Sequence, residues 1–220
     1  MNILVIAPHA DDEILGVGGT IAKYIHEGHN VFVCIASRGY MPLFSEELVK
    51  TVLKEAKECH KLLGIKETYY LDFPASMLEK VNRSEINDKL YEVIDKVQPD
   101  IVFIPHYGDM QKDHEIIAKA SMVVLRPKYK HKVKLIYSYE TVSETECNIP
   151  HTANAFIPNV YIDISPYLQK KMEAMKQYQS QLSDFPNPRS IEALDALAKH
   201  RGATINVRAA EAFALIRQVL

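Results

Sequence analysis

Four short apolar runs, none of which alternates with polar residues, constrain most strongly what this chain can fold into. They span residues 3–6, 31–35, 69–71 and 101–104. Strands that are buried on both faces have such sequences, whereas a strand with one wet face alternates. Between the runs, apolar residues recur at helical spacing. This succession predicts an α/β fold, a doubly wound and mostly parallel sheet with helices on both faces.

The topology of such a sheet says where a functional site would lie. If the strand order is the common 3-2-1-4-5, the first and fourth strands are neighbours. Ligands then bind in the crevice at the carboxyl ends of these strands. The chain has no linker composition and no internal repeat, so we expect one domain that spans residues 1–220.

Beyond the fourth strand the pattern is looser. Apolar runs predict further strands at residues 133–137 and 160–164. A serine followed by proline predicts the start of a helix over residues 165–179. Two C-terminal helices are expected after it, separated near Gly202.

Composition excludes several classes of function. A net charge of -2 gives no support for binding to nucleic acid or to an anionic membrane. The basic residues 128–132 are interpreted as a solvated loop. The N-terminus lacks the features of a signal peptide, and no apolar run approaches the length of a membrane span. Three cysteines without a CxxC pair fit buried thiols in a reducing compartment, so a cytoplasmic protein is expected.

The stretch Ala-Pro-His-Ala-Asp-Asp-Glu at residues 7–13 carries the chemistry. It follows the first strand and puts an imidazole and two adjacent carboxylates at the end of that strand. His9 and Asp12 are three residues apart and can hold one metal ion from two sides. Asp11, beside them, could act as a general base on a water molecule activated at the metal. A hydrolytic metal site follows if a third ligand comes from elsewhere.

Residues 106–114 follow the fourth strand and should face this motif across the crevice. His114 is the predicted third ligand. A His/Asp/His set with an open position suits catalytic zinc, which typically has about three protein ligands. Asp113 is predicted to orient His114 through a hydrogen bond. His106 could contact the substrate or simply finish the strand.

Each of these features also has a simpler structural explanation. The aspartates at positions 11, 12 and 113 could cap the helices that follow them. The glycines at positions 16, 18 and 19 match no nucleotide-binding loop and are interpreted as places of close packing between helix and sheet. The absence of a GxSxG motif argues against a serine hydrolase. Five further histidines are assigned to the surface: His26, His29, His60, His131 and His200.

With these residues in view, the chain resembles the LmbE/PIG-L family of zinc-dependent N-acetylglucosaminyl deacetylases. One signature is residues 8–13 followed by Gly-Gly-Thr at 18–20, and a second is Asp113-His114 preceded by Asp109. Further similar segments extend the resemblance over nearly the whole chain: residues 139–146, 158–164, 185–190 and 201–213.

The resemblance implies a Rossmann-like fold and removal of an N-acetyl group from an amino sugar or its conjugate. It implies Zn²⁺ as the cofactor, held by His9, Asp12 and His114, with Asp11 as the base. The substrate would be a small N-acetylated sugar. Because family members often form trimers or hexamers, a homo-oligomer of this kind is expected.

Four positions depart from the family pattern. Gln111 stands where the family usually has a histidine that polarises the carbonyl or protonates the leaving group, and Asn187 replaces another histidine. The Gln111 amide can donate a hydrogen bond but cannot carry a proton, so its predicted catalytic role is to stabilise the oxyanion. Val52 and Ala75 stand where relatives have an arginine and an aspartate near the sugar.

Two other functions stay open at this point. The same fold and metal set in some relatives hydrate an unsaturated oxo-acid. The substitutions at Gln111 and Asn187 would also fit a degenerate member that binds a sugar without turnover.

Overall fold

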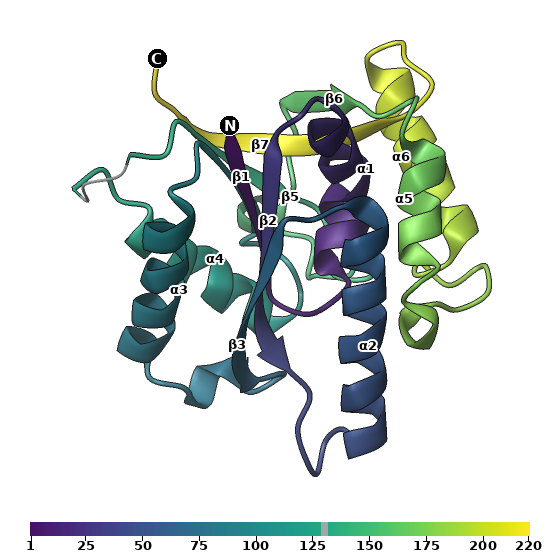
Figure 1. Ribbon diagram of the computed structural model, residues 1–220. Coiled ribbons are helices and arrows are strands. Elements are labelled where there is room, and N and C mark those ends of the chain that lie inside the picture. Colours follow the sequence, from purple (N-terminus) through teal and green to yellow (C-terminus); the bar gives the residue numbers. More distant parts are fainter. Residues whose placement is uncertain (129–131) are drawn as a thin grey trace.

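In the computed structural model, which describes residues 1–128 and 132–220, a central sheet is covered by helices on both faces (Figure 1). The predicted surface position of His131 falls outside the described residues. The same is true of most of the predicted basic loop, residues 128–132. The strands are β1 (Asn2–Ala7), β2 (Asn30–Arg38), β3 (Glu67–Pro74), β4 (Ile101–Pro105), β5 (Leu135–Tyr139), β6 (Val160–Asp163) and β7 (Ala210–Gln218). The α-helices are α1 (Asp12–His26), α2 (Glu46–Leu63), α3 (Arg83–Val97), α4 (Lys112–Val124), α5 (Leu168–Met175) and α6 (Ile191–Thr204).

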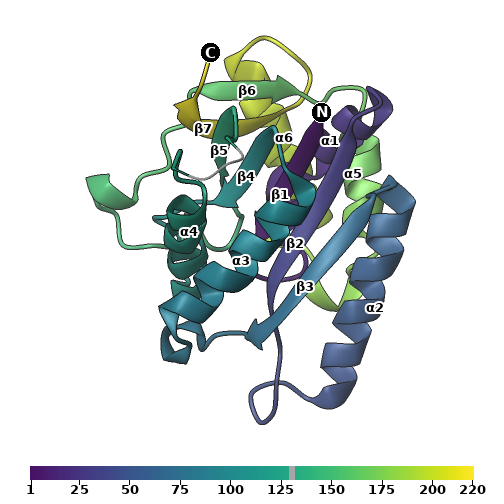
Figure 2. The same ribbon diagram turned by 60° about the vertical axis from the view of Figure 1, so that its left-hand side comes forward.

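The strand order confirms the predicted topology. It runs β3-β2-β1-β4-β5-β7-β6, so β1 lies between β2 and β4, and β3 and β6 are the two edges (Figure 2). The first five strands pair in parallel, whereas β7 pairs antiparallel with both β5 and β6. The carboxyl ends of β1 and β4 therefore meet at one edge of the sheet, and the loops after them face each other.

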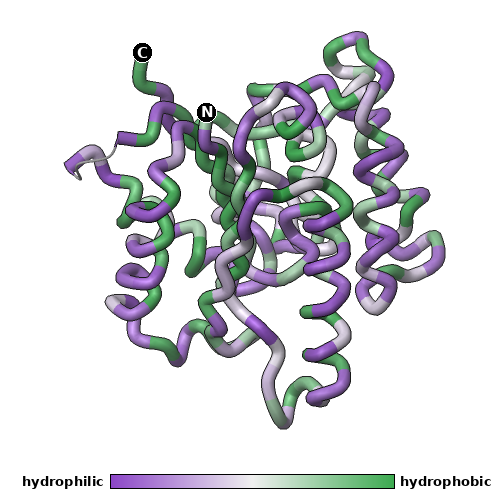
Figure 3. Tube along the Cα trace, in the orientation of Figure 1, coloured by the Kyte–Doolittle hydropathy of each residue, from purple (hydrophilic) through white to green (hydrophobic). Residues whose placement is uncertain are grey.

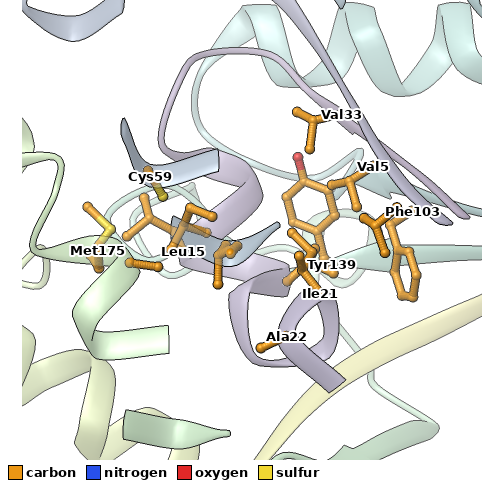
Figure 4. Close-up of a cluster of buried hydrophobic side chains, with 14 of the residues drawn as sticks. Val5, Leu15, Ile21, Ala22, Val33, Cys59, Phe103, Tyr139 and Met175 are labelled. Carbon is orange, nitrogen blue, oxygen red and sulfur yellow. The ribbon is translucent and has the colours of Figure 1, made fainter. Parts of the chain in front are cut away.

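Successive residues of each central strand enter two separate cores. Ile3 and Val5 of β1 pack under α1, α2 and α5, whereas Leu4 and Ile6 pack under α3 and α4. This burial on both faces explains the unbroken apolar runs, which form the hydrophobic centre in Figure 3. Tyr139 lies in the first core beside Val5 and Val33 (Figure 4), and its hydroxyl donates to the Ile6 carbonyl at 2.9 Å.

The glycines of α1 confirm the prediction of close packing. A Cβ on Gly16 would lie 2.3 Å from a ring carbon of Tyr139, and one on Gly19 would lie 2.6 Å from the Ile164 side chain. Both distances are far below van der Waals contact, so only glycine allows the helix to approach these neighbours so closely.

The C-terminal third differs from the prediction in two ways. The helix expected over residues 165–179 is shorter, because α5 spans only Leu168–Met175. The second C-terminal helix does not exist, because its residues form β7. Pairing with two neighbouring strands overrides the helical preference of this alanine-, glutamate- and leucine-rich segment. Gly202 also does not separate two helices: it lies inside α6, where a Cβ would lie 2.7 Å from the Ala209 backbone.

The described residues include no helix that is long and apolar enough to cross a membrane. Of the three cysteines, Cys34 and Cys59 are buried as expected, but Cys147 is exposed. Burial raises the pKa of Cys34 to about 12, which makes it an unreactive core residue.

Candidate metal centre

The structure brings together the three residues predicted as metal ligands. One ligand atom each from His9, Asp12 and His114 lies within 4.8 Å of the other two, and the two imidazole centroids are 5.4 Å apart. His9 follows β1, Asp12 is the first residue of α1, and His114 lies in the first turn of α4. The segments that follow β1 and β4 therefore lie together and form a cluster of two imidazoles and a carboxylate.

The turn that carries this motif is strained. Asp11 has φ 122° and ψ −30°, a conformation that residues with a side chain rarely adopt. Its backbone carbonyl accepts hydrogen bonds from Ile14 and Leu15, yet its side chain caps nothing. The capping explanation for Asp11 is therefore wrong, and its carboxylate is left for another purpose.

Each histidine is oriented by its own buried carboxylate. Nε2 of His9 donates to Asp113 at 2.9 Å, which leaves Nδ1 facing Asp12 at 3.3 Å. Nδ1 of His114 donates to Asp109 at 2.8 Å, which leaves Nε2 facing the same Asp12 oxygen at 3.3 Å. Such carboxylate–histidine pairs are typical of metal-binding imidazoles.

The prediction that Asp113 orients His114 is therefore wrong. Asp113 is held by the backbone N–H groups of Ser76 and Leu78, at 2.6 Å and 3.2 Å, and these fix it beside His9. Asp109, five residues before His114, takes the predicted role instead, and it also accepts from the Thr145 hydroxyl at 2.6 Å.

Unpaired atoms at the centre of the cluster fit a cation. Oδ1 of Asp12 and Nε2 of His114 are buried and have no hydrogen-bond partner, although Nε2 lies close to the second Asp12 oxygen. Leaving such atoms unpaired costs about 1–3 kcal/mol each. A divalent ion with mixed nitrogen and oxygen ligands would satisfy both.

The electrostatics also fit a cation that competes with protons. Burial alone would lower the pKa of His9, but hydrogen bonds with Asp113 and Asp12 raise it to about 9. Burial likewise opposes the charge on His114, but the Asp12 charge and the bond with Asp109 raise its pKa to about 10. Although burial works against it, the charge of His114 holds the pKa of Asp12 well below its usual range. The carboxylates around the two imidazoles thus stabilise positive charge at this point, which protons supply unless a metal ion displaces them.

The predicted base, Asp11, lies beside this cluster and is paired with a residue that sequence reasoning missed. Nη1 of Arg189 donates to Oδ2 of Asp11 at 2.6 Å, and Nε donates to the Ser143 hydroxyl at 2.8 Å. Burial raises the pKa of Asp11 to about 8, and the Arg189 charge opposes this rise. Arg189 lies in the family-like segment 185–190, but its pairing with Asp11 joins residues 178 positions apart and no local pattern reveals it.

A second buried hydrogen-bond network, centred on Glu13, fixes the turn that carries Asp11. The Tyr178 hydroxyl and Nε2 of His60 both donate to one Glu13 oxygen, at 2.6 Å and 3.0 Å, and the Asp11 backbone N–H donates to the other at 3.1 Å. His60 is buried, so its assignment to the surface was wrong. Exposure of His26 and His200 confirms that assignment for them.

Of the other residues considered from the sequence, Gln111 lines the cavity, whereas His106 and Asn187 make structural contacts. Gln111 lines the same cavity as His9 and Asp11, and its buried Oε1 has no partner. His106 makes a hydrogen bond with the Asn154 carbonyl at 3.0 Å and packs against Phe156, which favours its structural role. Asn187 is exposed, and its Oδ1 accepts from the Arg189 backbone at 2.8 Å, so it shapes the turn before Arg189.

A cavity of about 310 Å³ opens beside the cluster. Its polar side includes His9, Asp11, Gln111 and Arg189, so a molecule bound there would contact the predicted base and one of the three predicted metal ligands, His9. The volume falls at the lower end of the range of about 300–1,000 Å³ typical of small-molecule sites.

Comparison with known proteins assigns the class. The family described as GlcNAc-PI de-N-acetylase, PIG-L, matches residues 4–125, which is more than half of the chain. The chain therefore belongs to the PIG-L family, a family of metal-dependent N-deacetylases.

Individual relatives are distant and agree with this class. The chain is 25% identical over 194 residues to the probable N-acetyl-alpha-D-glucosaminyl L-malate deacetylase 2 of Bacillus anthracis, covering 83% of this chain and 82% of that protein. It is 27% identical over 199 residues to the diacetylchitobiose deacetylase of Thermococcus kodakarensis, covering 83% and 71%. The structure of N,N'-diacetylchitobiose deacetylase from Pyrococcus horikoshii superposes with a TM-score of 0.80 at 26% identity, covering 98% of this chain and 83% of that one.

Proposed function

We propose that this chain is a zinc-dependent hydrolase that removes the N-acetyl group from an N-acetylated amino sugar or sugar conjugate. The observation that carries the proposal is the His9/Asp12/His114 cluster with its two unpaired buried atoms, since His9 and the neighbouring Asp11 both line one cavity. The names of the relatives, which refer to glucosaminyl and chitobiose substrates, support an amino sugar.

His9, Asp12 and His114 would hold the ion. When bound, zinc supplies positive charge that lowers the pKa of water and polarises a carbonyl group. The two carboxylates behind the histidines, Asp113 and Asp109, keep one ring nitrogen of each imidazole directed toward the cluster.

Asp11 would accept a proton from the attacking water. Arg189 binds one oxygen of Asp11, which leaves the other free for that water. As the carbon–nitrogen bond breaks, Asp11 would pass the proton to the leaving nitrogen. Amide and water are thereby converted into acetic acid, which loses its proton to become acetate, and an amine, and Asp11 returns to its charged form.

Gln111 would donate its amide N–H to the acetyl oxygen as that oxygen gains negative charge. A single donor of this kind typically contributes about 3 kcal/mol to transition-state stabilisation. Since glutamine cannot deliver a proton, Asp11 alone would carry both proton transfers in this chain.

Acetate release from a panel of N-acetylated sugars, glycosides and sugar nucleotides, with the zinc-loaded protein, tests the proposal. Asp11→Asn should reduce release by about 10²–10⁴-fold while the protein still binds zinc. Asp88→Asn, an exposed change on α3, is the matched control and should keep full activity.

Other outcomes would point elsewhere. Undiminished release by Asp11→Asn would reject the role of Asp11. Hydration of an unsaturated oxo-acid, without release of acetate, would identify the hydratase alternative. Tight sugar binding at saturating zinc with no turnover would identify a binding protein.

The expected trimer or hexamer belongs to the same proposal. Light scattering during size-exclusion chromatography should show an oligomer, and a monomeric mass would contradict it.

A further inference from the structure

One wall of the active-site cavity is apolar, and nothing in the hydrolysis of an acetyl group requires it. The wall consists of Ile35 from β2, Phe44 from the loop after it, and four residues of α2: Leu48, Val49, Val52 and Leu53. The four helical residues recur at spacings of one, three and one, so a single face of α2 points into the cavity. Figure 1 shows α2 and this loop beside the carboxyl ends of β2 and β3.

The wall is preformed. The Phe44 backbone N–H donates to the Tyr40 carbonyl at 3.0 Å, which folds the loop back onto itself. A Cβ on Gly39 would lie 2.9 Å from the Phe44 side chain, so glycine at that position allows the ring to pack closely against the backbone. Leu48 stays 36% exposed at the rim, as an apolar side chain that still faces water.

Several polar side chains that line the cavity are already engaged, among them Arg38, whose Nε lies 3.4 Å from an Asp72 oxygen. The Ser37 hydroxyl donates to the Pro8 carbonyl at 2.7 Å, and the Ser180 hydroxyl donates to Glu55 at 2.6 Å. The Gln181 amide donates to the Ser180 hydroxyl at 3.0 Å. A sugar hydroxyl placed against the α2 wall would lose its hydrogen bonds to water and gain few in return.

We infer that this wall binds an alkyl or aryl group of the substrate, so that the preferred substrate is an N-acylated amino sugar with an apolar substituent. The inference rests on the proposed function and specifies its substrate class. The wall and the catalytic residues line one continuous cavity, so the apolar group belongs to the molecule that is hydrolysed. Its point of attachment is either a longer N-acyl chain or an aglycone on the sugar.

Two substrate series distinguish these attachment points. One is glucosamine carrying acetyl, butanoyl or hexanoyl groups, and the other is the methyl, butyl and hexyl glycosides of N-acetylglucosamine. The appearance of free amine measures both on the zinc-loaded protein. Each methylene that enters the cavity should raise kcat/KM by up to about fourfold. A rise in the first series identifies an acyl chain, and a rise in the second identifies an aglycone.

Variants of α2 tie the effect to the wall. Leu48→Asn should flatten the dependence on chain length, and so should Val52→Thr, which keeps the volume but adds a hydroxyl. Leu62→Asn is the matched control, since Leu62 is also on α2 and also 36% exposed, but does not line the cavity. It should keep the dependence found in the unmodified protein. The readout is a ratio within each variant, so a partial loss of folded protein does not change it.

Flat series in both arms, with acetyl substrates still hydrolysed, would overturn the inference and leave the proposed function intact. If no substrate releases an amine, the proposed function fails, and calorimetry then decides the inference. Tighter binding of the hexyl than the methyl glycoside, lost in Leu48→Asn, would support the apolar wall, and equal Kd values would overturn it.

Discussion

The guanidinium of Arg189 donates a hydrogen bond of 2.6 Å to the carboxylate of Asp11. Both side chains line the cavity beside the metal-binding cluster, and Arg189 is also 3.7 Å from a Glu144 oxygen. One cation is thus shared by two buried carboxylates, of which Asp11 is the proposed base. The charge state of that base therefore depends on a residue near the opposite end of the chain.

Removing Arg189 should shift the pH dependence of the reaction. The base must be ionised, so activity falls as the pH drops through the pKa of Asp11. Burial raises this pKa to about 8 and the charge of Arg189 opposes the rise, so Arg189→Gln should raise it further. The acid limb of kcat/KM should move to higher pH, and activity at low pH should fall about tenfold if the pKa rises by about one. Arg208→Gln, at an exposed position, should leave the profile unchanged, and an unchanged profile in Arg189→Gln would contradict the pairing.

The carboxylates behind the histidines should tune metal affinity. Asp113→Asn and Asp109→Asn each weaken the partner of one imidazole, and changes of this kind typically cost about 10–100-fold in affinity. Competition with a chelating dye measures the zinc Kd of each variant. Asp88→Asn is the control, because Asp88 is exposed on α3 and makes no hydrogen bond with either imidazole of the cluster. Equal affinity in all three variants would show that these carboxylates do not support the ion.

Zinc binding should release protons. The pKa values of about 9 for His9 and about 10 for His114 mean that both rings carry a proton near neutral pH in the metal-free protein. The ion must displace both protons. Below these pKa values its apparent affinity should therefore rise by up to about 100-fold for each unit of increase in pH. Titrations at several pH values in buffers of different ionisation enthalpy measure the proton release. An affinity independent of pH would contradict this electrostatic description.

The close approach of α1 to the sheet should make substitution of Gly16 destabilising. Alanine there would put a Cβ 2.3 Å from the Tyr139 ring and 2.9 Å from the Glu140 carbonyl. Overpacking of this kind typically costs about 1–3 kcal/mol, more than the roughly 1 kcal/mol that alanine gains in a helix. Gly18→Ala meets only the side chains of Ile14 and Lys171, at 3.0 Å and 3.2 Å, so its loss should be smaller. Urea unfolding compares the two, and the reverse order of stabilities would argue against this packing.

The sequence alone determined the central architecture and the members of the metal cluster. Continuous apolar runs separated by helical patterns indicated a parallel sheet covered on both faces, and the order 3-2-1-4-5, expected because it is common in such sheets, is the order observed. His9, Asp12 and His114 could be brought together because each follows a strand closely, and the topology aligns the ends of those strands.

Only the tertiary structure decided which residues complete the site. Asp113 pairs with His9 instead of its neighbour His114, and His60 is buried against Glu13. Residues 210–218 form a strand, although their composition favours a helix. The physical reason is the same in each case. Local periodicity records which face of an element is buried, but hydrogen bonds and strand pairing between distant segments depend on distances that exist only once the layers have packed.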